Sequence, residues 1–333
     1  MQTFQFTRAK DVDDAVKSGA ASPTAQQGAN VRYLAGGTTL IDLMKLHVET
    51  PGKVVDINRL PLDKIEETAD GLKIGATIRN SDLANHPIVK RDYAVLSQAL
   101  LSGASAQLRN MATTAGNLLQ RTRCVYFRDP AYPCNKREPG SGCPAIEGHN
   151  RTLAILGTSD HCIATNPSDM NVALAALEAV IHIQGPKVKR VVPVGDFHLL
   201  PGDTPGRETV LEPGDLVTHV MLPNPSAGSR SLYLKLRDRQ SYEFALASAA
   251  VIVTVDRAKI SRARIAMGGI GTKPWRSSEA EATLVGQAPT RESFREAADA
   301  LLKGAKPQAE NAFKVELARR CLVHALTLVT QRD

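Results

Sequence analysis

The stretch VRYLAGGTTLIDLMKL, residues 31–46, carries the pattern that decides the start of the fold. Its apolar run at 31–34 predicts a strand, Gly36-Gly37 predicts a turn, and apolar residues at helical spacing from Leu40 to Leu46 predict a helix. The segment KVVDI at 53–57 predicts another strand. Strand and helix signals that alternate over residues 1–60 indicate a small α/β unit.

Two further units follow, over residues 61–226 and 227–333. In the first, GLKIGATI predicts a strand, Ser81 is a candidate cap for a helix through DLANH, and YAVLSQALLSGASAQLRNM predicts one longer helix. In the second, FALASAAVIVTV is apolar enough for a buried helix or a strand pair. The Pro, Ser and Gly content of PSAGSRS at 225–231 predicts a linker between them.

The composition is that of an ordinary globular protein, with 43% hydrophobic and 23% charged residues in 333. The net charge of +7 is spread along the chain without a dense basic run, which favours a mildly basic surface over nucleic-acid binding. No stretch approaches the ~20 apolar residues of a membrane span, so no span is expected. The N-terminus lacks the apolar core of a secretion signal.

Two short loops have the chemistry of a phosphate site. AGGTTL at 35–40 combines two glycines, two threonines and a following helix, so backbone and hydroxyl donors can approach an anion. ATTAGN at 112–117 is similar, and the two loops could clamp one diphosphate from two sides. Neither is a P-loop or a G-x-G-x-x-G fingerprint, and a Gly-Gly turn before a helix is more often only a turn.

Asp169, in NPSDM, could accept a hydrogen bond from a sugar hydroxyl, or it could simply be an acid at a helix N-terminus.

Four of the five cysteines lie between residues 124 and 162, within a loop at 121–163 that is rich in Pro, Gly and Arg. A disulfide framework is not expected in a chain of this size without a secretion signal. Ligation of a metal or a cluster is therefore the better interpretation of the close-set cysteines. The spacing C-x9-C-x8-C-x18-C lacks the C-x(2–4)-C pair of structural zinc sites, yet spacing alone leaves zinc and iron–sulfur open. The candidate ligands are Cys124, Cys134, Cys143 and Cys162.

Taken in order, AGGTTLIDLMKL, IGATIRNSDLA, RNMATTAGNLLQ, NPSDM, KLRDRQSYEFALAS and MGGIGTKPWR resemble the flavin-binding medium subunit of molybdenum hydroxylases, the xanthine dehydrogenase and aldehyde oxidoreductase family. The resemblance implies an α+β protein. Two subdomains would form an FAD-binding fold of the vanillyl-alcohol-oxidase (PCMH) type, followed by a C-terminal α+β domain of the CO dehydrogenase flavoprotein type.

The resemblance also implies a set of FAD contacts. The first loop would wrap the diphosphate, the second would supply further donors, Asp169 would meet the sugar, and Lys235 and Val217 match flavin-contact positions. The implied residues are Arg32, Tyr33, Leu34, Ala35, Gly36, Gly37, Thr38, Thr39, Leu40, Thr113, Gly116, Asn117, Asp169, Val217 and Lys235. The family usually reads T-x-G-G-N at the second loop, so Ala115 would be strained if its position needs a positive φ.

The cysteine loop resembles a subgroup of heterotrimeric aldehyde oxidoreductases whose flavin subunit carries a 4Fe–4S cluster. The resemblance therefore favours a cluster over zinc at the four cysteines. Cys321 lies in an apolar helical segment and is expected to be a buried small hydrophobe.

The leading interpretation is an FAD- and 4Fe–4S-carrying electron-transfer subunit of a molybdenum-dependent aldehyde oxidoreductase. No catalytic residue is assigned, because the sequence has no acid–base or nucleophile constellation. Two rivals stay open: a stand-alone FAD oxidoreductase of the same fold, and a zinc-stabilised binding module.

The resemblance implies partners and a location. A large subunit would hold the molybdenum cofactor and a small subunit the 2Fe–2S clusters, in a heterotrimer that dimerises through the 4Fe–4S subunit. Export to the periplasm with a signal-bearing partner is expected, with the cytoplasm as the alternative.

Overall fold

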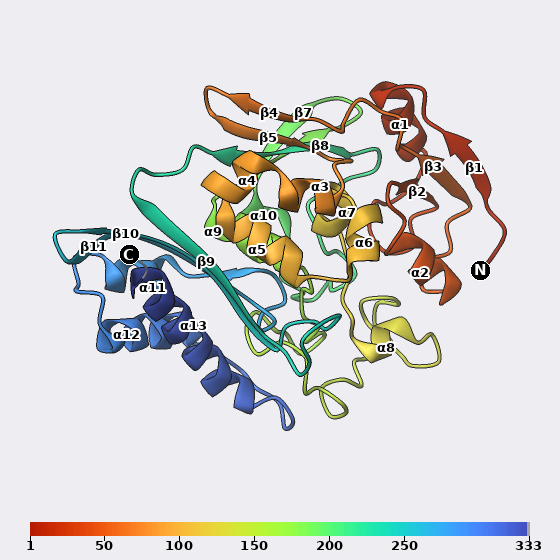
Figure 1. Ribbon diagram of the computed structural model, residues 1–333. Helices are drawn as coiled ribbons and strands as arrows, with labels where there is room; N and C mark the ends of the chain where they lie inside the picture. Colours follow the sequence, from red (N-terminus) through yellow and green to blue (C-terminus); the bar gives the residue numbers. More distant parts are fainter. Residues whose placement is uncertain (332–333) are drawn as a thin grey trace.

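The computed structural model describes residues 1–331. They form three sheet-based units and one long irregular segment, which lies between α7 (Thr114–Leu118) and α9 (Asp169–Ala176) in the chain (Figure 1). The first unit is a parallel sheet of order β1-β3-β2 with two helices. Its elements are β1 (Gln5–Arg8), α1 (Val12–Gly19), β2 (Val31–Leu34), α2 (Leu40–Lys45) and β3 (Lys53–Asp56). The strand, turn and helix expected over 31–46 are present as β2, the glycine turn and α2.

The second unit is an antiparallel sheet of order β4-β5-β8-β6-β7, packed against a group of short helices. Its strands are β4 (Ile65–Thr68), β5 (Gly71–Gly75), β6 (Val180–Gln184), β7 (Lys189–Pro193) and β8 (Leu216–Pro223). Its helices are α3 (Asn80–Asn85), α4 (Pro87–Asp92), α5 (Ala94–Ser102), α6 (Ala106–Met111), α7 (Thr114–Leu118), α9 (Asp169–Ala176) and α10 (Val194–Phe197).

The third unit is an antiparallel sheet of order β12-β11-β10-β9 with three helices on one face. Its elements are β9 (Ser229–Leu236), β10 (Ala247–Asp256), β11 (Lys259–Gly268), β12 (Trp275–Arg276), α11 (Ser278–Leu284), α12 (Arg291–Leu302) and α13 (Phe313–Gln331). The other face meets the second unit, where Ala250 and Ala266 join the core around α5 and α9. Because most of β10 is buried on both faces, FALASAAVIVTV is a continuous apolar run. It lacks the alternation of apolar and polar residues that marks a strand with one exposed face.

Three local expectations were wrong. Ser81 does not cap α3, which begins at Asn80 after Arg79; its hydroxyl instead contacts Asn110. The long helix expected over 93–111 is two helices, because α5 ends before Gly103 and α6 begins after its cap, Ser105. The linker at 225–231 ends early, because β9 already begins at Ser229.

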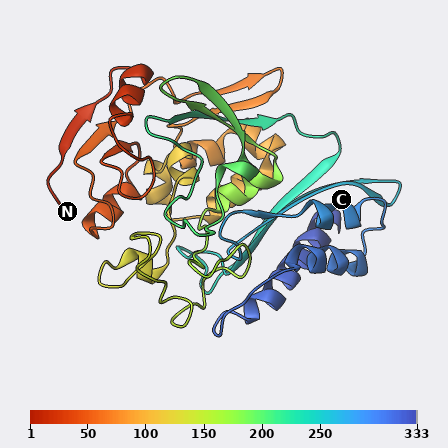
Figure 2. The ribbon, with the colours of Figure 1, turned by 180° about the vertical axis from the view of Figure 1, so that it is seen from behind.

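The segment 119–168 contains the short helix α8 (Val125–Arg128) and otherwise follows turns. In the view from behind, it lies beside the first unit, on the side toward the third unit (Figure 2). Within residues 1–331, no helix combines the length and apolar character needed to cross a bilayer.

Candidate functional site

The first loop, residues 35–40, lies directly against the second loop, residues 112–117. Gly37 has φ +73, a left-handed conformation that turns the chain from β2 into α2 at little cost only for glycine. A Cβ on Gly36 would lie 2.0 Å from the carbonyl oxygen of Met111. The first loop can therefore sit on the second only because residue 36 has no side chain.

The second loop forms the start of α7. The Thr113 hydroxyl accepts a hydrogen bond from the Gly116 amide at 3.2 Å, which caps the helix. Ala115 lies inside α7 and is not among the residues with positive φ. The position therefore does not need a positive φ, and the alanine that departs from the family pattern is accommodated without strain.

Both loops open onto a cavity of ≈ 270 Å³, here called the large cavity. Most of the expected FAD contacts line its wall. They are Arg32, Tyr33, Ala35, Gly36, Gly37, Thr38, Thr39, Leu40, Thr113, Gly116 and Val217. The cavity thus gathers donors from the first unit and the second loop around one space, as an extended anionic ligand requires, and β8 adds apolar wall through Val217.

The other expected contacts do not line the large cavity. Leu34 ends β2 away from the wall, and the Asn117 side chain accepts a hydrogen bond from the Ser168 hydroxyl at 2.7 Å. Asp169 is buried, and its carboxylate accepts from the Tyr233 hydroxyl at 2.6 Å and pairs with Lys235 Nζ at 2.8 Å. These bonds join α9 to β9, and Asp169 also borders a smaller adjoining cavity.

The four loop cysteines share a second cavity, here called the cysteine cavity. Cys124, Cys134, Cys143 and Cys162 all line it, together with Phe127 and other apolar side chains. All five cysteines of the chain are free thiols, and Cys321 is buried in α13 as expected. Four sulfur donors from four separate positions of the loop therefore face one space.

Backbone amides already point at these sulfurs. The Ala164 amide donates to Cys162 Sγ at 3.5 Å, and amides near Cys124 and Cys143 lie at their sulfurs in the same way. Burial raises the pKa of Cys124 to about 12 and also raises the pKa values of Cys143 and Cys162, which favours the thiol form of these side chains. As they stand, no three His, Cys, Asp or Glu side chains within residues 1–331 form a group that could hold a metal ion. In number, ligand type and amide support, the residues fit a thiolate-ligated group, whose binding would release protons.

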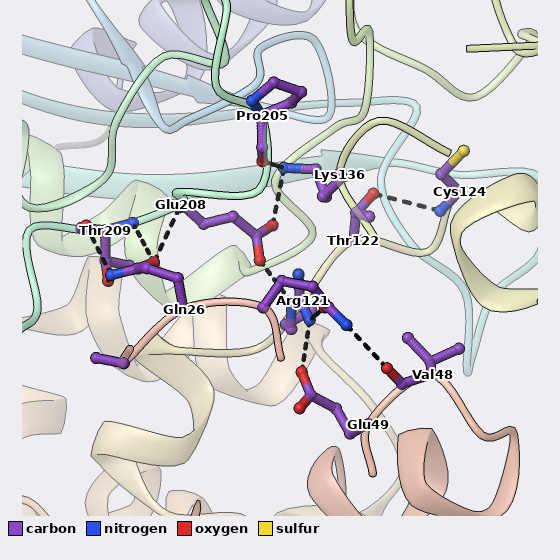
Figure 3. A network of polar contacts seen from close by, with 12 residues as sticks. Gln26, Val48, Glu49, Arg121, Thr122, Cys124, Lys136, Pro205, Glu208 and Thr209 are labelled. Carbon is purple, nitrogen blue, oxygen red and sulfur yellow. Dashed lines mark hydrogen bonds and ion pairs between the residues drawn. The ribbon is translucent and has the colours of Figure 1, made fainter. Parts of the chain in front are cut away.

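A network of buried charges lies where the two cavities meet, and Figure 3 shows its side chains. Arg121 pairs with Glu49 at 2.6 Å and with Glu208 at 2.5 Å. Glu208 also pairs with Lys136 of the cysteine loop at 3.0 Å, and Glu49 pairs with Arg32 at 2.9 Å. Burial alone would raise the pKa of Glu208, but Arg121 and Lys136 lower it to about 2, so this carboxylate stays ionised.

The network makes one wall common to both cavities. Lys136 and Cys162 line the large cavity and the cysteine cavity alike. Arg121 lies over the ring of Phe127, which lines the cysteine cavity, at 4.5 Å from the ring centroid. Arg121 Nη2 is buried and has no partner among the described residues, so a donor remains for a bound group.

Sequence reasoning missed this wall. Glu49, Arg121 and Glu208 belong to no motif, and Lys136 was noted only as part of the cysteine-loop pattern. Their ion pairs join positions far apart in the chain. The only available signal was the pair of basic residues, Arg121 and Arg123, that precedes Cys124.

Comparisons with known proteins agree with this geometry. Residues 2–225 match the family described as the FAD binding domain in molybdopterin dehydrogenase, and residues 232–329 match the CO dehydrogenase flavoprotein C-terminal domain. The aldehyde oxidoreductase FAD-binding subunit PaoB of Escherichia coli is 50% identical over 328 residues, 98% of each chain.

More distant relatives share the fold over their whole length. The carbon monoxide dehydrogenase medium chain of Hydrogenophaga pseudoflava is 26% identical over 99% of this chain and 98% of its own. A solved structure of carbon monoxide dehydrogenase from that organism superimposes with a TM-score of 0.77 over 99% of this chain and 98% of the other. The chain therefore belongs to the FAD-binding medium subunits of the molybdenum hydroxylases, which are oxidoreductases of several subunits.

Proposed function

We propose that this protein is the FAD- and 4Fe–4S-containing electron-transfer subunit of a molybdenum-dependent aldehyde oxidoreductase. The observation that carries the proposal is the pair of adjoining cavities, one lined by the two donor loops and the other by four cysteines. The 50% identity to an aldehyde oxidoreductase subunit supports the reaction class.

The chain's own residues would hold and separate the two cofactors. Gly36, Gly37, Thr113 and Gly116 let backbone and hydroxyl donors approach the diphosphate, and the four cysteines would ligate the cluster. When bound, the flavin and the cluster supply the one- and two-electron chemistry. The apolar wall of the cysteine cavity, with Phe127 fully buried, limits water around the sulfurs.

A cysteine pair tests the cluster. Cys134→Ser should lose iron and acid-labile sulfide, because one of the four ligands is removed, whereas Cys321→Ser should keep both, because Cys321 packs in α13. Iron, sulfide, zinc and flavin are measured per chain in the purified complex. A wild-type protein with stoichiometric zinc and no iron, or full iron in Cys134→Ser, contradicts the proposal.

We further propose that the chain works between a large molybdenum-cofactor subunit and a small 2Fe–2S subunit, with the heterotrimer dimerising through this subunit. Co-expression with both partners and size measurement by light scattering test this. Turnover of aldehydes by the isolated chain at the rate of the full complex would instead support a stand-alone enzyme.

The proposed location is the periplasm, reached by co-export with a signal-bearing partner. Fractionation of cells that express all three subunits tests it. Retention of the flavin subunit in the cytoplasm when the partner's signal is intact would contradict it.

A further inference from the structure

We propose that the ammonium group of Lys136 is a fixed positive charge that raises the reduction potential of the iron–sulfur group in the cysteine cavity. The inference rests on the proposed function, since it assigns a role toward the cluster. Lys136 would be a positioning residue for electron transfer and would not be a ligand.

Lys136 is held in place at both ends. Its backbone follows Cys134 in a tight turn, in which the amides of Arg137 and Glu138 donate to the Cys134 carbonyl at 2.9 and 2.7 Å. Its ammonium pairs with Glu208 at 3.0 Å and donates to the Pro205 carbonyl at 2.9 Å. A long flexible side chain is thus fixed beside the cysteines.

A charge at the position of Lys136 would act on both cofactors. The residue is 8% exposed and lines both cavities together with Cys162. Water screens such a charge poorly, because the effective dielectric constant of a protein interior is far below that of water.

The network carries more positive than negative charge. Arg32, Arg121 and Lys136 face only two carboxylates, Glu49 and Glu208, in the connected set. A thiolate-ligated cluster becomes more negative when reduced, so a nearby excess of positive charge favours the reduced form. Of the three cations, Lys136 alone lines the cysteine cavity.

A purely structural role predicts a different result. If Lys136 only braces the loop, its removal lowers stability or iron content and leaves the potential of the remaining clusters unchanged. If its charge tunes the cluster, the potential moves with the sign of the change. Glu208 allows the sign to be reversed at the same contact, because its loss removes a negative charge.

The test is a redox titration of the 4Fe–4S signal by electron paramagnetic resonance in the complete complex. Lys136→Met should lower the midpoint potential by about 59 mV, which corresponds to a tenfold change in a one-electron equilibrium constant. Glu208→Gln should raise it, and Lys136→Arg should stay near wild type. The matched control is the exposed pair Lys73–Glu66, joined at 2.8 Å, for which Lys73→Met and Glu66→Gln should not shift the potential.

An iron-replete Lys136→Met variant with an unchanged potential overturns the inference, and so does a Glu208→Gln shift in the negative direction. If Lys136→Met loses its iron, Glu208→Gln decides the matter by the sign of its shift, and Lys136→Arg decides it by whether its potential stays near wild type. A wild-type protein without iron would contradict the proposed function itself. A normal iron content without the expected shifts in midpoint potential would contradict only this inference.

Discussion

At the scale of single residues, Gly36 is the tightest constraint on the large cavity. The place where its Cβ would lie is already taken by the backbone of Met111. Gly36→Ala should force the two loops apart, cost about 1–3 kcal/mol of stability and lower the FAD content. Bound flavin and the unfolding temperature are measured, with Gly195→Ala as the control because nothing lies within 4 Å of a Cβ there. Full FAD in Gly36→Ala would show that the loop contact is dispensable.

His198 should make stability fall in mild acid. Its Nε2 must carry the proton, because it contacts the Leu118 carbonyl at 3.0 Å, and burial lowers its pKa to about 4. As the pH falls through about 6.5, the imidazole of His198 becomes protonated in the unfolded chain but not in the folded one. The free energy of unfolding therefore decreases. Between pH 7.5 and 5.5 the loss is about 1 kcal/mol.

The measurement for His198 is the unfolding temperature at both pH values, compared with His198→Gln. The variant should show a smaller drop between pH 7.5 and 5.5. An equal drop in both proteins would place the acid sensitivity elsewhere.

At the scale of elements, the first turn of α13 holds residues 152 and 153 of the cysteine loop. Lys314 is fully buried, and its ammonium donates to the carbonyls of Thr152, Leu153 and Gly269. Lys314→Met leaves these carbonyls without that donor and should destabilise the protein by about 3 kcal/mol. Thermal unfolding measures the change, and Lys303→Met, on an exposed site after α12, is the control. Equal unfolding temperatures for the two variants would show that the Lys314 contacts do not stabilise the protein.

Short elements with a clear local pattern could be predicted from the sequence, whereas the type of β10 and the break between α5 and α6 could not. The strand and helix of residues 31–46 show clear local patterns and were found. The type of β10 stayed open because both of its faces are buried. The break at Gly103 was missed because apolar spacing continues on both sides of it.

The site divides in the same way. The glycines and threonines of the two loops have local patterns that indicate phosphate binding, so most of the residues expected to contact the flavin do line the large cavity. Asp169 shows the limit of that reasoning, because Tyr233 and Lys235 satisfy its carboxylate from another unit. The shared wall depends on Glu208 and Arg121, which only tertiary folding brings together.

At the scale of the whole molecule, Arg121 ties three parts of the chain together. It pairs with Glu49 of the first unit and Glu208 of the second, and it stacks on Phe127 of the cysteine loop. Arg121→Met leaves two buried carboxylates short of a partner, at a cost of about 3–5 kcal/mol. It should lower FAD and iron content together. Arg320→Met, at an exposed helical pair with Glu316, is the control and should change neither. Loss of only one cofactor in Arg121→Met would show that the cavities are independent.

The anchoring of residues 152 and 153 by Lys314 bears on biosynthesis. The cysteines leave the ribosome well before Lys314 does, so during translation the cysteine loop lacks the contact that fixes residues 152 and 153. Its final shape depends on a residue that is made after all four cysteines. Under the proposed function, iron and sulfide would meet a fully formed pocket only after residue 314 has been made and folded.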